Sequence, residues 1–374
     1  MDVVDRGTVM ASRAKTDAAS LAFGSVCALA SGRWLVGMRA APSKTGRSSW
    51  AVLSRSDDQG RTWSEPAEPM PAISWEGRCG VWRSGMYAAL GGERVAGVLC
   101  WEDLTDPFAP MYNETTEGIV DLRHVVMVSE DGGETWSEPR RIPGGRFDDV
   151  PLAITGPILL MPDGRWAFSC EVNKTYHDAS PWQHHSIVMF SEDEGATWTE
   201  PVVTHTDPQR RVFCWDQRVS ALSDGRMLVM YWTFDREAAV YLNMHAAEST
   251  DGGATFSAVW DTGVPGQPAP VVDLGDGRLV LVYVDRTDRP TIKARVSRDG
   301  GRSFDADSEL IIHDRGVGTQ IIRKGGMNDA WDEMNDYSVG LPAATPLGGG
   351  EMLVVYYTGP HADATDIQWA RLRG

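Results

Sequence analysis

The sequence predicts an all-β chain, built as a ring of six similar four-stranded antiparallel sheets. Three observations support this prediction. The 374 residues include 39 glycines and 15 tryptophans, with many short runs rich in valine, isoleucine and tyrosine, a composition typical of strands joined by tight turns. One eight-residue motif occurs five times, and a glycine turn between two apolar runs occurs six times. Internal repeats of this kind indicate one structural unit used several times.

The eight-residue motif follows the pattern S-x-D-x-G-x-[ST]-[WF]. Its aspartate can accept backbone N–H bonds inside a tight turn, and its glycine supplies the positive φ that such a turn needs. Its aromatic ring can fill the space between neighbouring sheets. We therefore expect the five aspartates to stabilise the fold. The copies occupy residues 56–63, 129–136, 191–198, 249–256 and 297–304.

The second repeat is an apolar run, a glycine turn and another apolar run. It recurs about every 64 residues, so six copies nearly fill the chain. We therefore expect residues 1–374 to form a single domain. The turns are SGR at 31–33, GGE at 91–93, PDG at 162–164, SDG at 223–225, GDG at 275–277 and GGG at 348–350.

Each unit contains four predicted strands, which the fifth unit shows most clearly as GQPAPVVDL, RLVLVYVDR, TIKARVSRD and, after the motif, SELIIHD. A ring of six such blades is a β-propeller. The sixth unit ends at IQWARLRG, one strand short, so we expect the N-terminal segment VVDRGTVM to supply its outer strand. Residues 235–247 have a composition that a helix tolerates, but YLNMHAAES aligns with the third strand of the other units.

Charge and cysteine content narrow the function classes. The chain has 35 basic and 52 acidic residues, a net charge of −17, which disfavours nucleic acids and anionic membrane surfaces as partners. No apolar run approaches the length of a membrane span, and the N-terminus lacks the apolar core of a signal peptide. The five cysteines are far apart and most lie in apolar runs, so we expect buried reduced thiols and a cytoplasmic protein.

The five motifs resemble the Asp boxes, or BNR repeats, of the sialidase (neuraminidase) superfamily, and six blades is the architecture of that superfamily. The resemblance covers nearly the whole chain. It implies that the motifs connect the third and fourth strands on the face opposite the active site, and that their aspartates are structural.

The active face of such a propeller collects the starts of first strands and the ends of second strands. Charged and aromatic residues concentrate at these positions. Second-strand ends supply Arg39, Trp101 to Asp103, Glu171, Asp235, Arg236, Asp285, Arg286 and Tyr357, and first-strand starts supply Arg78, Asp148, Asp149, Trp215 to Arg218 and Asn335 to Tyr337. We expect these residues to converge on one axial pocket.

The resemblance implies a tyrosine nucleophile with a carboxylate partner, an acidic proton donor, and arginines that hold a substrate carboxylate. Tyr337, in a Tyr-Ser pair at the start of the last blade, matches the nucleophile. Asp216 matches the position of the base partner, and Glu171 is a candidate proton donor if burial raises its pKa.

The substrate-binding candidates are Arg236 and Arg286, which end second strands, Arg39, which ends the second strand of the first blade, and the neighbouring Trp215 and Arg218. The planar guanidinium group suits a carboxylate. Two family features are missing from their usual places. The segment TDAASLAFGSV has no arginine, and the loop AAPSKTGRSSW has no acid.

The sequence therefore predicts an exo-acting glycoside hydrolase of the sialidase type, acting on sialic acid or another terminal acidic sugar, without a metal or another cofactor. Two alternatives stay open. One is a carbohydrate lyase in which Tyr337 or a histidine of residues 176–185 removes a proton alpha to a carboxylate. The other is a non-catalytic propeller that binds a glycan or a protein. The oligomeric state is not predicted.

Overall fold

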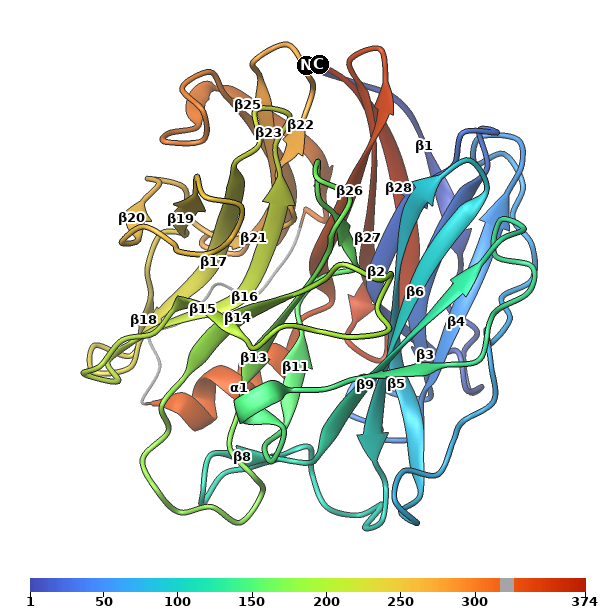
Figure 1. Cartoon of the computed structure of the whole chain (residues 1–374). Coiled ribbons are helices and arrows are strands. Elements are labelled where there is room, and N and C mark those ends of the chain that lie inside the picture. Colours follow the sequence, from blue (N-terminus) through green and yellow to red (C-terminus); the bar gives the residue numbers. More distant parts are fainter. Residues whose placement is uncertain (317–325) are drawn as a thin grey trace.

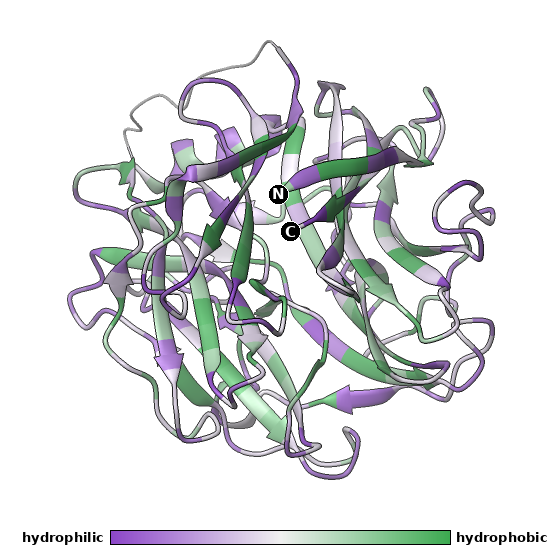
Figure 2. Ribbon diagram, turned by 90° about the horizontal axis from the view of Figure 1, so that it is seen from above, coloured by the Kyte–Doolittle hydropathy of each residue, from purple (hydrophilic) through white to green (hydrophobic). Residues whose placement is uncertain are grey.

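The computed structural model describes residues 1–316 and 326–374 and shows a six-bladed β-propeller (Figure 1). The sheets are antiparallel and surround the centre of the molecule when it is seen from above (Figure 2). The first strand of each blade lies nearest the centre. The predicted all-β ring of six blades is therefore confirmed.

The first three blades follow the chain in order. Blade 1 contains β2 (Ser20–Ala28), β3 (Trp34–Ala41) and β4 (Trp50–Ser56), whose outer edge bonds Ala67 through Leu53. Blade 2 contains β5 (Gly80–Gly91), β6 (Arg94–Asp103), β9 (Leu122–Ser129) and β10 (Arg140–Ile142), and blade 3 contains β11 (Leu152–Ile154), β12 (Leu159–Leu160), β13 (Trp166–Val172), β14 (His185–Ser191) and β15 (Val202–His205).

The other three blades complete the ring. Blade 4 contains β16 (Val212–Ala221), β17 (Met227–Asp235), β18 (Val240–Tyr241), β19 (His245–Ser249) and β20 (Trp260–Asp261). Blade 5 contains β21 (Gln267–Pro268), β22 (Val272–Asp273), β23 (Leu279–Asp285), β24 (Thr291–Ser297) and β25 (Asp305–Asp314). Blade 6 contains β26 (Val339–Gly348), β27 (Glu351–His361), β28 (Ala364–Arg373) and the N-terminal β1 (Asp2–Met10). The segment 235–247 forms β18 and part of β19, as the alignment of the repeats predicts.

The N-terminal strand closes the ring. β1 pairs antiparallel with β28 from Asp2, opposite Arg373, to Met10, opposite Ile367. The two chain ends consequently lie side by side at the top of the view in Figure 1. Closure satisfies the edge of β28, which would otherwise offer unpaired backbone groups to another chain.

The five repeated motifs form the same hydrogen-bonded turn. In the second copy, the Asp131 carboxylate accepts bonds from the backbone N–H and the hydroxyl of Thr135, at 2.9 and 2.6 Å. The Ser129 hydroxyl donates to Asp131 and accepts from the N–H of Gly133. These bonds lower the pKa of Asp131 to about 2. The aspartates therefore act on the turn, as the pattern predicts.

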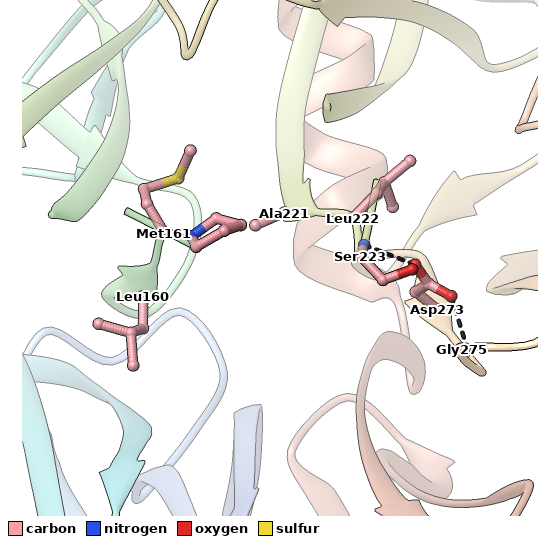
Figure 3. A pocket seen from close by; sticks show the side chains of 8 residues that line it. Leu160, Met161, Ala221, Leu222, Ser223, Asp273 and Gly275 are labelled. Carbon is pink, nitrogen blue, oxygen red and sulfur yellow. Dashed lines mark hydrogen bonds between the residues drawn. The ribbon is translucent and has the colours of Figure 1, made fainter. Parts of the chain in front are cut away.

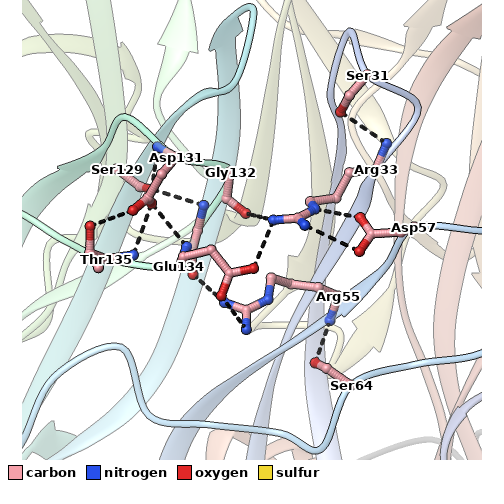
Figure 4. A network of polar contacts seen from close by, with 11 residues as sticks. Ser31, Arg33, Arg55, Asp57, Ser64, Ser129, Asp131, Gly132, Glu134 and Thr135 are labelled. Carbon is pink, nitrogen blue, oxygen red and sulfur yellow. Dashed lines mark hydrogen bonds and ion pairs between the residues drawn. The ribbon is translucent and has the colours of Figure 1, made fainter.

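In three of the five motifs, a backbone carbonyl accepts a bond from an arginine of the preceding blade, at the end of the turn between its first and second strands. Arg33 of blade 1 donates to the carbonyl of Gly132 in the motif of blade 2 and pairs with Asp57 and Glu134 (Figure 4). Arg165 and Arg226 make the equivalent bond to the motif glycines Gly252 and Gly300 of the next blade. The repeat therefore encodes contacts between blades as well as the turn itself.

The cysteines are unpaired. Four of them are buried, as predicted, because they lie on strands inside the blades; these are Cys27, Cys100, Cys170 and Cys214. The prediction is wrong for Cys79, which is exposed just before β5. No helix in the described residues is long and apolar enough to cross a membrane.

Candidate functional site

The first strands of four blades are interrupted at the same level. The ladder is irregular beside Phe23 in β2, Arg83 in β5, Asp216 in β16 and Leu341 in β26. Phe23, Asp216 and Leu341 have the positive φ values 55°, 48° and 39°, which are unusual outside glycine. All four side chains line one axial cavity. The bulges therefore turn side chains of the inner strands into the centre of the ring.

The cavity has a volume of about 380 Å³ and receives side chains from all six blades. Residues of α1 (Met327–Asp336) and of the short hairpin β7 (Tyr112–Asn113) and β8 (Gly118–Ile119) line it. These elements lie at the end of the molecule opposite the chain termini (Figure 1). The size of the cavity suits one sugar-sized ligand.

Helix α1 and the β7–β8 hairpin meet above the cavity. Tyr112 donates from its hydroxyl to Asn328 Oδ1 at 2.8 Å and stacks on Trp331, with ring centroids 4.7 Å apart. The three indole rings of Trp182, Trp215 and Trp232 add an aromatic wall. This wall offers flat apolar surfaces for the C–H faces of a ring-shaped ligand.

Tyr337 follows α1 and lines the cavity. Its hydroxyl donates to Glu333 Oε2 at 2.9 Å, and the guanidinium carbon of Arg286 lies 3.8 Å from the centroid of its ring. Burial, together with the neighbouring Tyr241, raises the pKa of Tyr337 far above its usual value. The phenol is therefore neutral, and the Glu333 carboxylate beside it can accept its proton.

Asp216 and Glu171 form the acidic part of the wall. Asp216 pairs with Arg218 at 2.6 Å and accepts a bond from the amide of Gln267 at 2.6 Å. Burial raises the pKa of Asp216, and the charge of Glu171 adds to this effect against the opposing charge of Arg218. Glu171 itself accepts from the backbone N–H of Gln217. The site therefore holds one carboxyl group that keeps a proton more readily than usual.

Gln267 connects the two halves of the site. Its amide oxygen accepts a bond from Arg286 at 2.9 Å, so its amide nitrogen faces Asp216. Arg286 also donates to the carbonyl of Val339, beside Tyr337. The Gln267 side chain therefore holds both Arg286, which lies against the Tyr337 ring, and Asp216.

Five of the residues that the sequence suggested for the site lie at the cavity. Tyr337, Asp216, Glu171, Arg218 and Trp215 all line it. Tyr337 is not paired with Asp216 as expected: its phenol donates to Glu333, and the Asp216 carboxylate is bound to Arg218 and Gln267. The sequence offered one signal for Glu333, its spacing of four residues from Tyr337, but the helix that makes this spacing a contact was not predicted.

Three of the predicted substrate-binding arginines do not line the cavity. Arg39 is fully buried and donates to the carbonyls of Lys44 and Gly46, so it shapes a loop. Arg236 pairs with Glu117 and lies over the ring of Phe213. None of Arg39, Arg236 and Arg286 is among the lining residues. Arg39 is buried, whereas the Arg236 side chain is partly exposed and is engaged by Glu117. Arg286 contacts the Tyr337 ring from behind.

The sequence analysis missed three cationic residues of the wall, Lys44, Arg47 and Arg83. Arg47 and Arg83 both pair at 2.7 Å with Glu102, which has no exposed surface. Burial opposes ionisation of Glu102, but the two guanidinium groups outweigh it and lower its pKa. The buried Glu102 therefore fixes Arg83 at the wall.

A second cavity lies at the opposite end of the axis, among turns that join first and second strands (Figure 3). It is lined mainly by apolar side chains, including Leu160, Met161 and Leu222. Its Asp273 carboxylate accepts bonds from the backbone N–H groups of Ser223 and Gly275, both at 2.8 Å. The Asp273 carboxylate is bound to backbone groups of the turns. The candidate catalytic residues line the first cavity, at the other end of the axis.

Comparisons with known proteins agree with this architecture. The sequence model of the BNR repeat-like domain matches residues 111–318. A sialidase of Micromonospora viridifaciens is 26% identical over 206 residues, which cover 47% of this chain and 30% of that protein. The match thus spans less than a third of that relative.

Solved structures share the fold at low sequence identity. A Dyadobacter fermentans protein of unknown function has a TM-score of 0.72 and 20% identity, covering 100% of this chain and 98% of that chain. The NanB sialidase of Streptococcus pneumoniae has a TM-score of 0.65 and 13% identity, covering 98% of this chain and 70% of that chain. The Trypanosoma rangeli sialidase in complex with sialic acid has a TM-score of 0.63 and 12% identity, covering 99% of this chain and 59% of that chain.

The family model spans more than half of the chain, and the repeats, the six blades and the similar structures agree with it. The chain therefore belongs to the BNR repeat-like domain family of the sialidase superfamily.

Proposed function

We propose that this protein is an exo-acting glycoside hydrolase that removes a terminal acidic sugar, with Tyr337 as its nucleophile. The observation that carries the proposal is the arrangement around this tyrosine. Its hydroxyl donates to Glu333, its ring lies over Arg286, and it faces an enclosed cavity. A hydroxyl nucleophile needs an adjacent proton acceptor, and Glu333 supplies one.

In the first step the Tyr337 oxygen attacks the anomeric carbon while its proton passes to Glu333. Arg286 stabilises the negative charge that develops on the phenol oxygen. A neutral phenol approaches an anionic sugar without the repulsion that a carboxylate nucleophile would meet. The raised pKa of Tyr337 is consistent with this neutral resting state.

Departure of the aglycone requires a proton on the glycosidic oxygen. Asp216 suits this role because its pKa is raised and its side chain lines the cavity. In the second step Asp216 takes a proton from water and the water oxygen attacks the anomeric carbon. The bond to Tyr337 breaks, and Glu333 returns its proton to the phenol oxygen. Glu171 supports the cycle by keeping Asp216 protonated at the start.

Cationic groups favour an anionic sugar despite the net charge of −17. Arg83 and Arg218 line the cavity, and together with Lys44 in its protonated form they create a local positive field that attracts a carboxylate. Trp215 offers a flat face for the sugar ring. The names of the similar proteins, sialidases of three organisms, support the same substrate class.

A screen of chromogenic glycosides of sialic acid and uronic acids tests the proposal. The wild type releases the chromophore, and Tyr337→Phe lowers this rate by several orders of magnitude. Tyr283→Phe is the matched control, because Tyr283 makes the same kind of bond to Glu309 at 2.6 Å outside the cavity; it leaves the rate unchanged. An unsaturated sugar product would indicate a lyase, and binding without turnover a glycan-binding propeller.

A further inference from the structure

Lys44 is a basic residue of the cavity, and its side-chain nitrogen bonds two uncharged oxygen atoms. It lies in the loop between β3 and β4 and lines the cavity. Its Nζ donates to the backbone carbonyl of Tyr337 and to the hydroxyl of Tyr357, the latter at 3.3 Å. An ammonium group has three donors, so these two bonds leave one donor for a ligand.

Other cations surround this amine. Lys44 Nζ lies 5.5 Å from the ring centroid of Tyr337, the ring that also covers Arg286 at 3.8 Å. Arg39 donates to the carbonyl of Lys44 itself. Two cations at one aromatic ring, with a third close by, repel one another unless negative charge enters among them.

The acidic groups near Lys44 compensate this only in part. They are Asp336 at the end of α1 and Asp363 between β27 and β28, and Asp363 accepts a bond from the backbone N–H of Lys44. Burial is the largest influence on Lys44, followed by Arg286 and Arg39, and together they lower the pKa of Lys44 well below its usual value despite both carboxylates.

We infer that Lys44 adjusts the charge of the cavity to its ligand: its amine takes up one proton from solvent when a carboxylate of a sugar acid enters, and the resulting ammonium binds that carboxylate. The identity of the ligand rests on the proposed function. The reaction balances, because a neutral amine and a proton give an ammonium ion while the carboxylate keeps its charge. The net charge of the filled cavity is then the same as that of the empty one.

Linkage gives the direction of the pH dependence. The carboxylate raises the pKa of Lys44 in the complex above its value in the empty cavity. Between these two values, binding consumes a proton, so affinity falls as pH rises, by up to about tenfold per pH unit. At pH values below the pKa that Lys44 has without ligand, the lysine is already charged. Binding then takes up no proton.

Titration calorimetry with N-acetylneuraminate and glucuronate tests the inference. At a series of pH values, the heat of binding measured in two buffers that differ in ionisation enthalpy gives the number of protons taken up. For the wild type we expect this number to rise to about one between the pKa of Lys44 without ligand and its pKa in the complex. Lys44→Met should abolish this uptake and weaken binding by about thirtyfold or more. Lys44→Arg, which stays charged, should bind without uptake.

Lys293→Met is the matched control, because Lys293 pairs with Asp285 and Glu309 outside the cavity; it should behave as the wild type. Equal proton uptake in the wild type and both Lys44 variants would overturn this inference alone. Binding of neither sugar acid by the wild type would overturn the inference and the proposed substrate class together. Lys44→Arg keeps the test decisive if Lys44→Met fails to fold.

Discussion

Tyr337 donates its hydroxyl proton to Glu333, which lies four residues earlier on helix α1. Both groups of the proposed nucleophilic pair therefore come from one short segment, MNDAWDEMNDY. Residues four apart on a helix share one face, so the helix itself sets their distance. Arg286, from blade 5, then reaches the ring of Tyr337 across the blade boundary.

Glu333→Gln should lower kcat by about 10²- to 10⁴-fold, because the amide cannot accept the phenol proton as a base. The change should leave the melting temperature nearly unaltered. Steady-state kinetics on the best chromogenic glycoside measures the effect. Glu309→Gln removes the carboxylate from the corresponding bond to Tyr283 outside the cavity and should keep full activity; equal losses in both variants would contradict the assignment.

The pH profile should report Asp216. Activity requires its protonated form as proton donor, so kcat should fall as pH rises through the raised pKa of Asp216. Glu171→Gln removes a negative charge that raises this pKa, and the basic limb of the profile should therefore move to lower pH. If Glu171→Gln is folded and active but its basic limb lies at the same pH as that of the wild type, Glu171 does not raise the pKa of Asp216, and the prediction is contradicted.

Asp131→Ala should lower the melting temperature by a few degrees and leave the activity of each folded molecule unchanged, and Asp193→Ala should do the same. Both aspartates bond their own turn, on the face opposite the cavity. Because the pKa of Asp131 is lowered to about 2, its stabilising effect is present above pH ~4 and lost as the pH falls toward ~2. Thermal denaturation at several pH values and an activity assay measure both effects.

Removal of residues Asp2–Met10 should destabilise the ring and promote association. These residues form the outer strand of blade 6, and without them β28 presents a free edge that can pair with another chain. Size-exclusion chromatography and thermal denaturation of the truncated chain test this. A monomer with the wild-type melting temperature would show that β1 adds nothing to closure.

The repeats predicted the blades because each blade is encoded locally. The turn at Gly225, the motif at Ser249 and the strand β19 lie close together in the sequence, and the same order recurs around the ring. Closure by β1 followed from the strand missing in the sixth unit. That residues 1–374 form a single domain stays a prediction.

The site was predicted less completely because its geometry depends on irregular features. The bulges at Arg83 and Asp216 have no repeat signature, and α1 is an insertion whose composition is mostly polar. Lys44 was not predicted because it lies in an irregular loop, AAPSKTGRSSW, whose sequence does not indicate where the lysine side chain points. Its contact with Tyr357 joins residues 313 positions apart in the chain, which spacing alone does not indicate.

The nucleophilic role of Tyr337 is the central claim, and trapping the glycosylated protein tests it most directly. A fluorinated acidic glycoside with a good leaving group slows the second step, so the sugar stays attached while the aglycone departs. Proteolysis and mass spectrometry then identify the labelled residue. The account predicts the sugar on Tyr337 in the wild type and no label in Tyr337→Phe. A label on another residue, or turnover of the parent glycoside by Tyr337→Phe at the wild-type rate, would contradict it.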